Sequence, residues 1–167
     1  MSSPPPPPTQ THEQLTLAGA RLALAAAERR AQELGLGMNI AVVDGATHLL
    51  CFARMPGAKI TSIGIAIDKA FTAAGHRLGT HLYKEAVWPG GPAYGLGNSN
   101  GGRFTTFGGG LPILNARGEV IGGIGASTGT PAQDQLVVQA GVDALREVLH
   151  GGSGGGGGDG ERVKAKL

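Results

Sequence analysis

The sequence predicts an α+β domain in which helices pack on an antiparallel β-sheet. Three segments, near residues 16–34, 60–78 and 130–148, repeat apolar residues at the three- and four-residue spacings of a helix. Two pairs of short apolar runs are each joined by turn residues, which is typical of β-hairpins. Because no strand–helix–strand unit requires a parallel pair, the hairpins favour an antiparallel sheet with helices on one or both faces.

The first helix is expected to begin after Thr16, whose hydroxyl suits an N-cap, and to end near Leu34, before two glycines. Its predicted buried stripe comprises Leu17, Ala20, Leu24, Ala27, Ala31 and Leu34. Leu22 and several alanines widen the apolar surface beyond that stripe, which indicates a second neighbour and therefore an oligomer.

A hairpin is predicted from residues 39–44 and 48–53, because Asp44-Gly45-Ala46-Thr47 between them is turn chemistry. The second helix follows, with its predicted buried stripe at Ile60, Ile63, Ile67, Ala70, Phe71, Ala74 and Leu78. Lys69 stands in the middle of this apolar helix. The irregular segment 79–102 is long for a small domain, and such loops are usually functional or mobile.

The region 103–127 is the centre of the predicted fold. A strand is expected near residues 104–107, followed by a triple glycine whose bare backbone permits positive φ and close approach of a ligand. Two further strands, 111–114 and 119–127, form the second hairpin, and the glycines of the latter fit either close helix packing or a ligand site. The last helix is expected to start at Thr130-Pro131, with Gln133 completing a capping box.

Composition excludes several classes of function. The formal net charge is +2 and aromatic residues make up 4% of the 167 residues, so the dense basic and aromatic surface of a nucleic-acid binder is missing. No run approaches the roughly 18 apolar residues of a membrane span. No secretory signal pattern occurs at the N-terminus, so we expect a cytoplasmic protein without a membrane partner. The one cysteine, Cys51, lies in an apolar run and is expected to be an inert, buried thiol.

The composition of the two ends of the sequence sets the expected domain boundaries. Residues 1–14 are expected to be a disordered proline-rich arm and residues 151–167 a disordered glycine-rich tail. Residues 15–150 then form one folded domain.

Four motifs occur in order along the chain: AVVDGATHLL at 41–50, IAIDKAFTAA at 65–74, FGGGLPI at 107–113 and GEVIGGIGAS at 118–127. Through them the chain closely resembles the GlcG/HbpS family, also called the haem-degrading domain family, and the C-terminal domain of propanediol-utilisation corrinoid adenosyltransferases. The resemblance implies a profilin-like fold with a five-stranded antiparallel sheet and homo-oligomers from dimers to octamers. It also implies haem as a cofactor, with haem or iron sensing and slow haem breakdown in parts of the family.

The resemblance carries over residue by residue only at the motifs. The matching positions are Asp44, His48, Lys69, Phe71, Thr72, Phe107, Gly108, Gly109, Gly110 and Pro112. Thr80 falls near the position of a family threonine placed close to haem iron. We therefore expect residues 108–112 to form one wall of a ligand pocket and residues 69–72 another.

Haem binding needs an axial ligand, a flat apolar slot and cations for the propionates. His76 and His81 are the candidate ligands, with His48 a further one at the start of its strand. On a continuous helix the first two would point about 140° apart, so both reach one ion only if the helix ends between them. The candidate propionate partners are Lys69, Arg77 and Arg103.

An enzymatic alternative uses Lys69 instead. If this lysine is buried, its pKa falls, and it suits a general base or an enol-stabilising cation beside the amides of the triple glycine. With Asp44 or Asp134 as partner, it would support proton transfer on a small organic acid. The third interpretation is that the protein is a structural scaffold and binds neither class of ligand.

Overall fold

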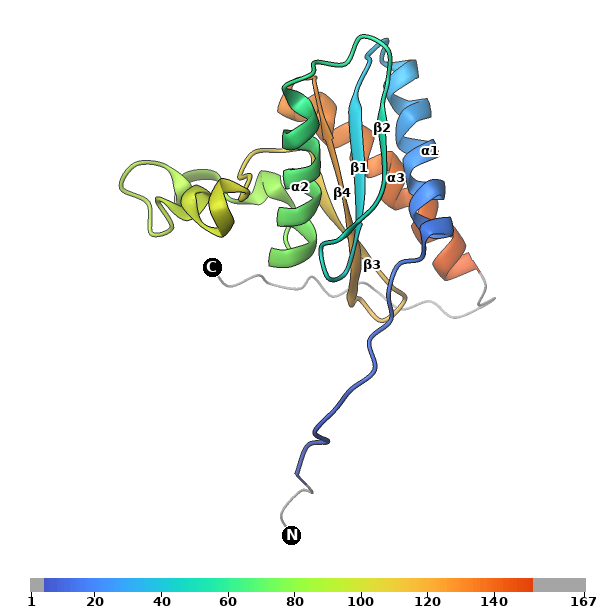
Figure 1. The fold of residues 1–167 in the computed structure, drawn as a ribbon, viewed down its shortest axis with the longest axis vertical. Helices are drawn as coiled ribbons and strands as arrows, with labels where there is room; N and C mark the ends of the chain where they lie inside the picture. The colour runs from blue at the N-terminus through green and yellow to red at the C-terminus, as the bar shows by residue number, and fades with distance from the viewer. Residues whose placement is uncertain (1–4, 152–167) are drawn as a thin grey trace.

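The computed structural model describes residues 5–151, which form three layers around one β-sheet (Figure 1). The strands are β1 (Asn39–Asp44), β2 (Leu49–Arg54), β3 (Gly110–Leu114) and β4 (Val120–Ser127), in the order β2-β1-β4-β3. All neighbouring strands are antiparallel. Helix α2 (Ser62–His76) covers one face, whereas α1 (Leu17–Glu33) and α3 (Pro131–Gly151) pack together on the other. The predicted α+β class with an antiparallel sheet is therefore confirmed.

The expected fifth strand is not found in the described part of the chain. Residues 104–107 have no strand partner, and the backbone N–H of Thr105 instead donates to Thr72 Oγ1 on α2 at 2.9 Å. A side chain of the helix thus takes the hydrogen bond that a sheet neighbour would have made. The sheet has four strands in residues 5–151.

Both predicted helix caps are present. Thr16 Oγ1 accepts the N–H of Gly19 at 3.2 Å and starts α1. At α3 the cap is reciprocal, because Gln133 N–H donates to Thr130 Oγ1 at 3.3 Å and Thr130 N–H donates to Gln133 Oε1 at 2.9 Å. Local side-chain chemistry therefore fixes where these helices begin.

The buried face of α2 differs from the predicted stripe. The helix buries mainly small residues against the sheet, together with Lys69, whereas Ile60 just before it is 75% exposed. The cause lies in β4: a Cβ on Gly125 would be 2.5 Å from Ala70 N and 2.9 Å from Lys69 Cβ. Since the helix backbone lies directly on the bare strand, only small side chains fit between them. Ala70 and Ala74 of the predicted stripe are buried there, and Ile67 packs beside them partly buried.

The larger core lies on the opposite face, between the sheet and the α1–α3 pair. Its fully buried members include Ala20, Ala23, Ala27, Ile40, Val42, Ile124, Val137 and Val138. Alanines on α1 let α3 approach closely. This face anchors β4 and the start of α3, which together position the candidate site.

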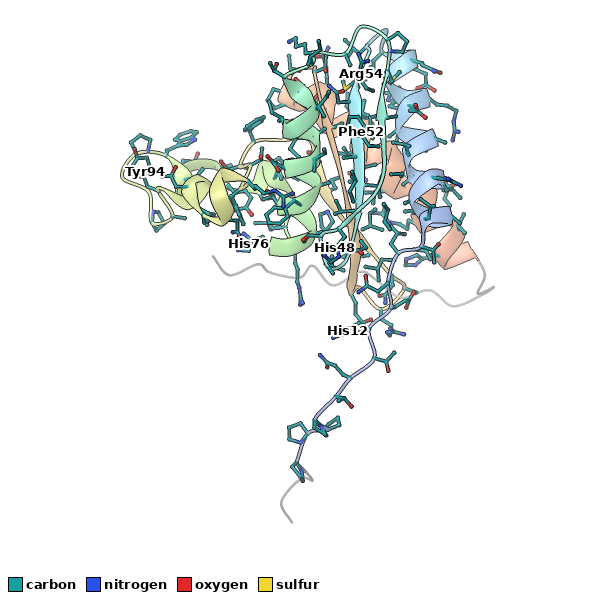
Figure 2. All side chains as sticks on the ribbon, in the orientation of Figure 1. His12, His48, Phe52, Arg54, His76 and Tyr94 are labelled. Carbon is teal, nitrogen blue, oxygen red and sulfur yellow. The ribbon has the colours of Figure 1, made fainter. Side chains whose placement is uncertain are left out.

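Residues 79–102 project from the layers beside α2 (Figure 1). They contain four short 3-10 turns, Thr80–Leu82, Lys84–Val87, Leu96–Asn98 and Asn100–Gly102, instead of a regular helix. Trp88 and Tyr94 are 57% and 67% exposed. Figure 2 shows Tyr94 at the outer end of this projection, away from the layers.

Only part of the expected arm and tail falls within the described residues. Residues 1–4 and 152–167 of the expected arm and tail fall outside the described residues, so their disorder stays a prediction. Residues 5–14 contain no helix or strand, but Gln14 Oε1 accepts the N–H of Gly45 at 3.1 Å, so the last part of the expected arm contacts the body. No helix in residues 5–151 is long and apolar enough to cross a membrane.

Candidate functional site

The glycine turn, defined as Gly108, Gly109 and Gly110, leads into β3 and lies against α3. Gly109 has φ +111°, which side-chain-bearing residues rarely adopt. A Cβ there would be 2.5 Å from Asp134 Cβ and 2.8 Å from Lys69 Nζ. The turn therefore requires glycine for both its conformation and its contacts.

Side chains already hold two amides of the turn. The N–H of Gly109 donates to Gln135 Oε1 at 3.1 Å, and the N–H of Gly110 donates to Thr80 Oγ1 at 2.9 Å. Thr80 is fully buried. These amides fix the glycine turn to α3 and to the 3-10 turn Thr80–Leu82. They are therefore not free to hold an oxyanion.

Lys69 forms a buried ion pair beneath the turn. Its Nζ lies 2.7 Å from Asp134 Oδ2 and donates to Ala126 O at 3.0 Å, and the two charged side chains are 0% and 2% exposed. The ring centroid of Phe107 is 4.7 Å from the same Nζ. One ammonium thus joins α2, the end of β4, the first turn of α3 and the residue before the glycine turn.

Burial and pairing act in opposite directions on this couple. Burial lowers the pKa of Lys69, while the hydrogen bond and charge of Asp134 counteract part of that shift. Burial likewise raises the pKa of Asp134 against the opposing effect of Lys69. Asp134 Oδ1 also accepts the N–H of Gly129 at 3.0 Å, so both carboxylate oxygens have a partner.

An open cleft of about 320 Å³ lies on the outer side of the glycine turn. We call it the glycine-turn cleft, and its lining residues are His81, Lys84, Thr106, Phe107, Gly108, Pro131, Ala132 and Gln135. Phe107 is 47% exposed. The expectation that residues 69–72 form a second wall does not match this lining. Lys69 lies behind Phe107 and Gly109, and the start of α3 takes its place.

His81 is the candidate ligand that faces this cleft. A Cβ on Gly108 would lie 3.5 Å from His81 Cβ, so the histidine and the turn are direct neighbours. Burial lowers the pKa of the His81 imidazole below its ordinary value of 6.5, and the positive charge of Lys84 lowers it further. Near neutral pH the ring is uncharged, which is the form that coordinates a metal.

His76 lies elsewhere, between α2 and the projecting segment (Figure 2). Its Nδ1 is 2.6 Å from the hydroxyl of Tyr83, and its ring meets Phe104 edge-on at 5.2 Å between centroids. Burial raises the pKa of Tyr83 to about 12. The helix does end between the two histidines, with Arg77 in the left-handed region, but His76 does not line the cleft.

Asp44 and His48 form a separate cluster at the far end of β1. Asp44 Oδ1 accepts the N–H groups of Ala46 and His48 at 2.9 Å each, and so closes the turn between β1 and β2. The His48 side chain is 80% exposed. Ala126, which contacts Lys69, pairs with Ile40 near the other end of β1. Of the two partners expected for Lys69, the structure places Asp134 beside it.

The remaining expected site residues hold other parts of the fold. Buried Thr72 bonds Thr105, as described above. Arg103 pairs through Nε with Asp68 Oδ1 at 3.0 Å, and its guanidinium stacks 3.9 Å from the ring centroid of Phe71. Pro112 lines hollows beside Leu114 and Gly118 and does not reach the glycine-turn cleft.

Other chemistry is limited in the described residues. Within residues 5–151 no group of three His, Cys, Asp or Glu side chains is placed to hold a metal ion. Cys51 is only partly buried, and burial raises the pKa of its thiol, so the reactive thiolate is disfavoured at neutral pH.

Comparisons with known proteins agree with this fold. The sequence profile of the family described as haem degrading protein HbpS-like matches residues 15–143. This chain belongs to the HbpS-like family. An uncharacterised 15.0 kDa protein of Citrobacter freundii is 40% identical over 134 residues, which cover 80% of this chain and 94% of that protein.

Two further relatives are similar to this HbpS-like chain, one in sequence and one in both sequence and structure. The corrinoid adenosyltransferase PduO of Salmonella typhimurium is 33% identical over 147 residues, covering 88% of this chain but 44% of the enzyme. The crystal structure of PduOC in complex with haem is 34% identical with a TM-score of 0.74, over 78% of this chain and 94% of that one. Both resemblances inferred from the sequence are thereby confirmed.

Five residues that line the glycine-turn cleft were not among the candidates from the sequence: Lys84, Thr106, Pro131, Ala132 and Gln135. A signal for the last three was available, because the strong helix start at Thr130-Pro131 marks a helix N-terminus close after the motif 118–127. Nothing local points to Lys84 or Thr106.

Proposed function

We propose that this HbpS-like chain binds haem, or a related iron tetrapyrrole, in the glycine-turn cleft. The observation that carries the proposal is His81, an imidazole with a lowered pKa at the edge of an open cleft beside an exposed aromatic ring. The haem complex of the relative PduOC supports the same ligand class.

The chemistry of the cleft fits such a ligand. Phe107, Pro131 and Ala132 supply apolar contact for a macrocycle, and Lys84 supplies a cation for a propionate. A volume of about 320 Å³ is at the small end of ligand pockets, so a bound tetrapyrrole would remain partly exposed to solvent. A bound haem supplies the iron and its redox chemistry, and the residues of this chain hold and orient it.

His81 suits the axial position better than the other candidates do. Thr80 is fully buried and its hydroxyl is bonded to the Gly110 amide, so it supports the turn that flanks the ligand. His76 is engaged with Tyr83, and His48 lies beyond the end of β1 and does not line the cleft. Haem sensing and slow haem breakdown are further proposals for the same site, and both require that haem binds first.

The alternative function, proton transfer on an organic acid through Lys69, is favoured less by the geometry. The amides of Gly109 and Gly110, which would have held the developing negative charge, already donate to side chains. Lys69 itself is buried and paired with Asp134. We therefore assign Lys69 no part in proton transfer, and its ion pair with Asp134 supports the glycine turn.

A hemin titration tests the proposal. At pH 7.5, where His81 is neutral, hemin is expected to give a saturable, shifted Soret band with the wild-type chain. His81→Ala should weaken binding by at least about tenfold, equivalent to 1.4 kcal/mol, because the axial ligand is lost. His76→Ala is the matched control and should bind as the wild type does. Equal loss in both variants, or none in His81→Ala, contradicts the assignment.

A further inference from the structure

Within residues 5–151, Lys69 has one N–H without a hydrogen-bond acceptor. An ammonium donates three hydrogen bonds, and those to Asp134 Oδ2 and Ala126 O account for two of them. The remaining contact of Nζ is the ring of Phe107, 4.7 Å from the centroid. Phe107 is also 47% exposed and lines the glycine-turn cleft. A single aromatic ring therefore lies between a fully buried cation and the cleft.

The cleft itself has the electrostatics of an anion site. None of its eight lining residues is acidic, and Lys84 contributes a positive charge. The first residues of the 21-residue helix α3, Pro131 and Ala132, line the same cleft and bring the positive end of the helix dipole to it. The nearest buried carboxylate, Asp134, is already paired with Lys69.

We propose that the glycine-turn cleft binds a carboxylate group, which displaces the ring of Phe107 and accepts the third N–H of Lys69. This inference goes beyond haem binding, because the carboxylate can belong to a free organic acid or to a tetrapyrrole propionate. Phe107 acts as a lid, and Lys69 is the buried group that selects a negative charge.

The movement that this requires is small and inexpensive. The side chain of Phe107 makes no hydrogen bond, and about half of its surface already faces solvent, so rotation of the ring forfeits mainly its contact with the ammonium. In exchange, Lys69 and the carboxylate form a charge-assisted hydrogen bond in the protein interior, where the dielectric constant is low. Such a bond is stronger than the cation–π contact that it replaces. Asp134 and Ala126 O keep their bonds to Lys69, so the support of the turn is unchanged.

Propionate is the probe for the test, observed through broadening of its proton NMR signals on titration with the intact chain. Propionamide has nearly the same shape without the charge and serves as the matched ligand control. We expect saturable binding of propionate and none of propionamide at the same concentrations. Equal binding of both ligands, or of neither, overturns the proposal.

Variants assign the contact to Lys69 and the lid to Phe107. The folded double variant Lys69→Met/Asp134→Asn, which leaves no unpaired buried charge, should lose at least about tenfold in propionate affinity, the value of one charge-assisted hydrogen bond. Phe107→Ala should tighten binding about two- to fivefold by removing the competing ring contact. Tyr94→Ala, which removes an exposed aromatic on the projecting segment, should change nothing. Loss of binding in Lys84→Ala with retention in the double variant, or no tightening in Phe107→Ala, contradicts the assignment.

Hemin and hemin dimethyl ester distinguish the two sources of the carboxylate. If the group is a tetrapyrrole propionate, hemin displaces propionate and the ester, which lacks carboxylates, binds more weakly than hemin. If it belongs to a free acid, the ester binds as well as hemin. The two proposals can be tested independently. If propionate binds but hemin gives no Soret shift, the carboxylate site is supported and haem binding is contradicted.

Discussion

Lys69→Met is expected to lower the free energy of unfolding by about 3–5 kcal/mol, because it leaves the Asp134 carboxylate buried without its partner. The loss extends beyond one contact. The Lys69 ammonium also holds Ala126 O at the end of β4 and touches Phe107, so the glycine turn loses its support from below. Urea denaturation followed by circular dichroism measures the change.

Two comparison variants isolate the cause of this loss. Lys69→Met/Asp134→Asn removes both charges while keeping an acceptor for the Gly129 N–H, so it should recover part of the lost stability. Lys84→Met removes an exposed lysine and should stay within about 0.5 kcal/mol of the wild type. If Lys69→Met is as stable as Lys84→Met, the buried pair does not support the fold.

Gly125→Ala is expected to destabilise the domain by about 1–3 kcal/mol, because the new methyl group has no space between β4 and α2. It would meet the backbone carbonyl of Ala66 and lie 2.5 Å from Ala70 N, and backbone atoms of a helix cannot rotate away. The helix would have to shift as a whole and take Lys69 with it. The same change should therefore weaken hemin binding as well as thermal stability.

The matched control is Gly64→Ala on α2, the helix that packs against Gly125. A Cβ at Gly64 would meet nothing within 4 Å, so the substitution should stabilise the protein by about 0.4–1 kcal/mol through the lower entropy of the unfolded chain. Melting temperatures of the two variants should thus move in opposite directions. A Gly125→Ala protein that melts with or above the wild type would show that α2 does not lie directly on β4.

Features governed by neighbouring residues were predictable from the sequence. The caps at Thr16 and Thr130 and both hairpins follow from side chains within a few positions, and the structure confirms them. The family resemblance also indicated the glycine turn and Lys69. The expected assembly into oligomers and the cytoplasmic location stay predictions.

Features governed by distant residues were not predictable. The buried face of α2 depends on Gly125, which is more than 50 positions from Ala70, so helical periodicity identified Ala70 and Ala74 as buried but did not identify Lys69. Local sequence offered both Asp44 and Asp134 as partners of Lys69, and only the sheet register separates them. The cleft is lined both by the 3-10 turns that contain His81 and Lys84 and by the start of α3. No pattern in the sequence links these two parts of the chain.

Haem binding in the glycine-turn cleft, as proposed above, requires His81 to hold the iron. Anomalous scattering at the iron absorption edge, from crystals of the hemin complex, locates that iron directly. We expect a single iron peak at coordination distance from an imidazole nitrogen of His81, with the macrocycle against Phe107. A peak beside His76 or His48, or one with no contact to the glycine-turn cleft, would contradict it.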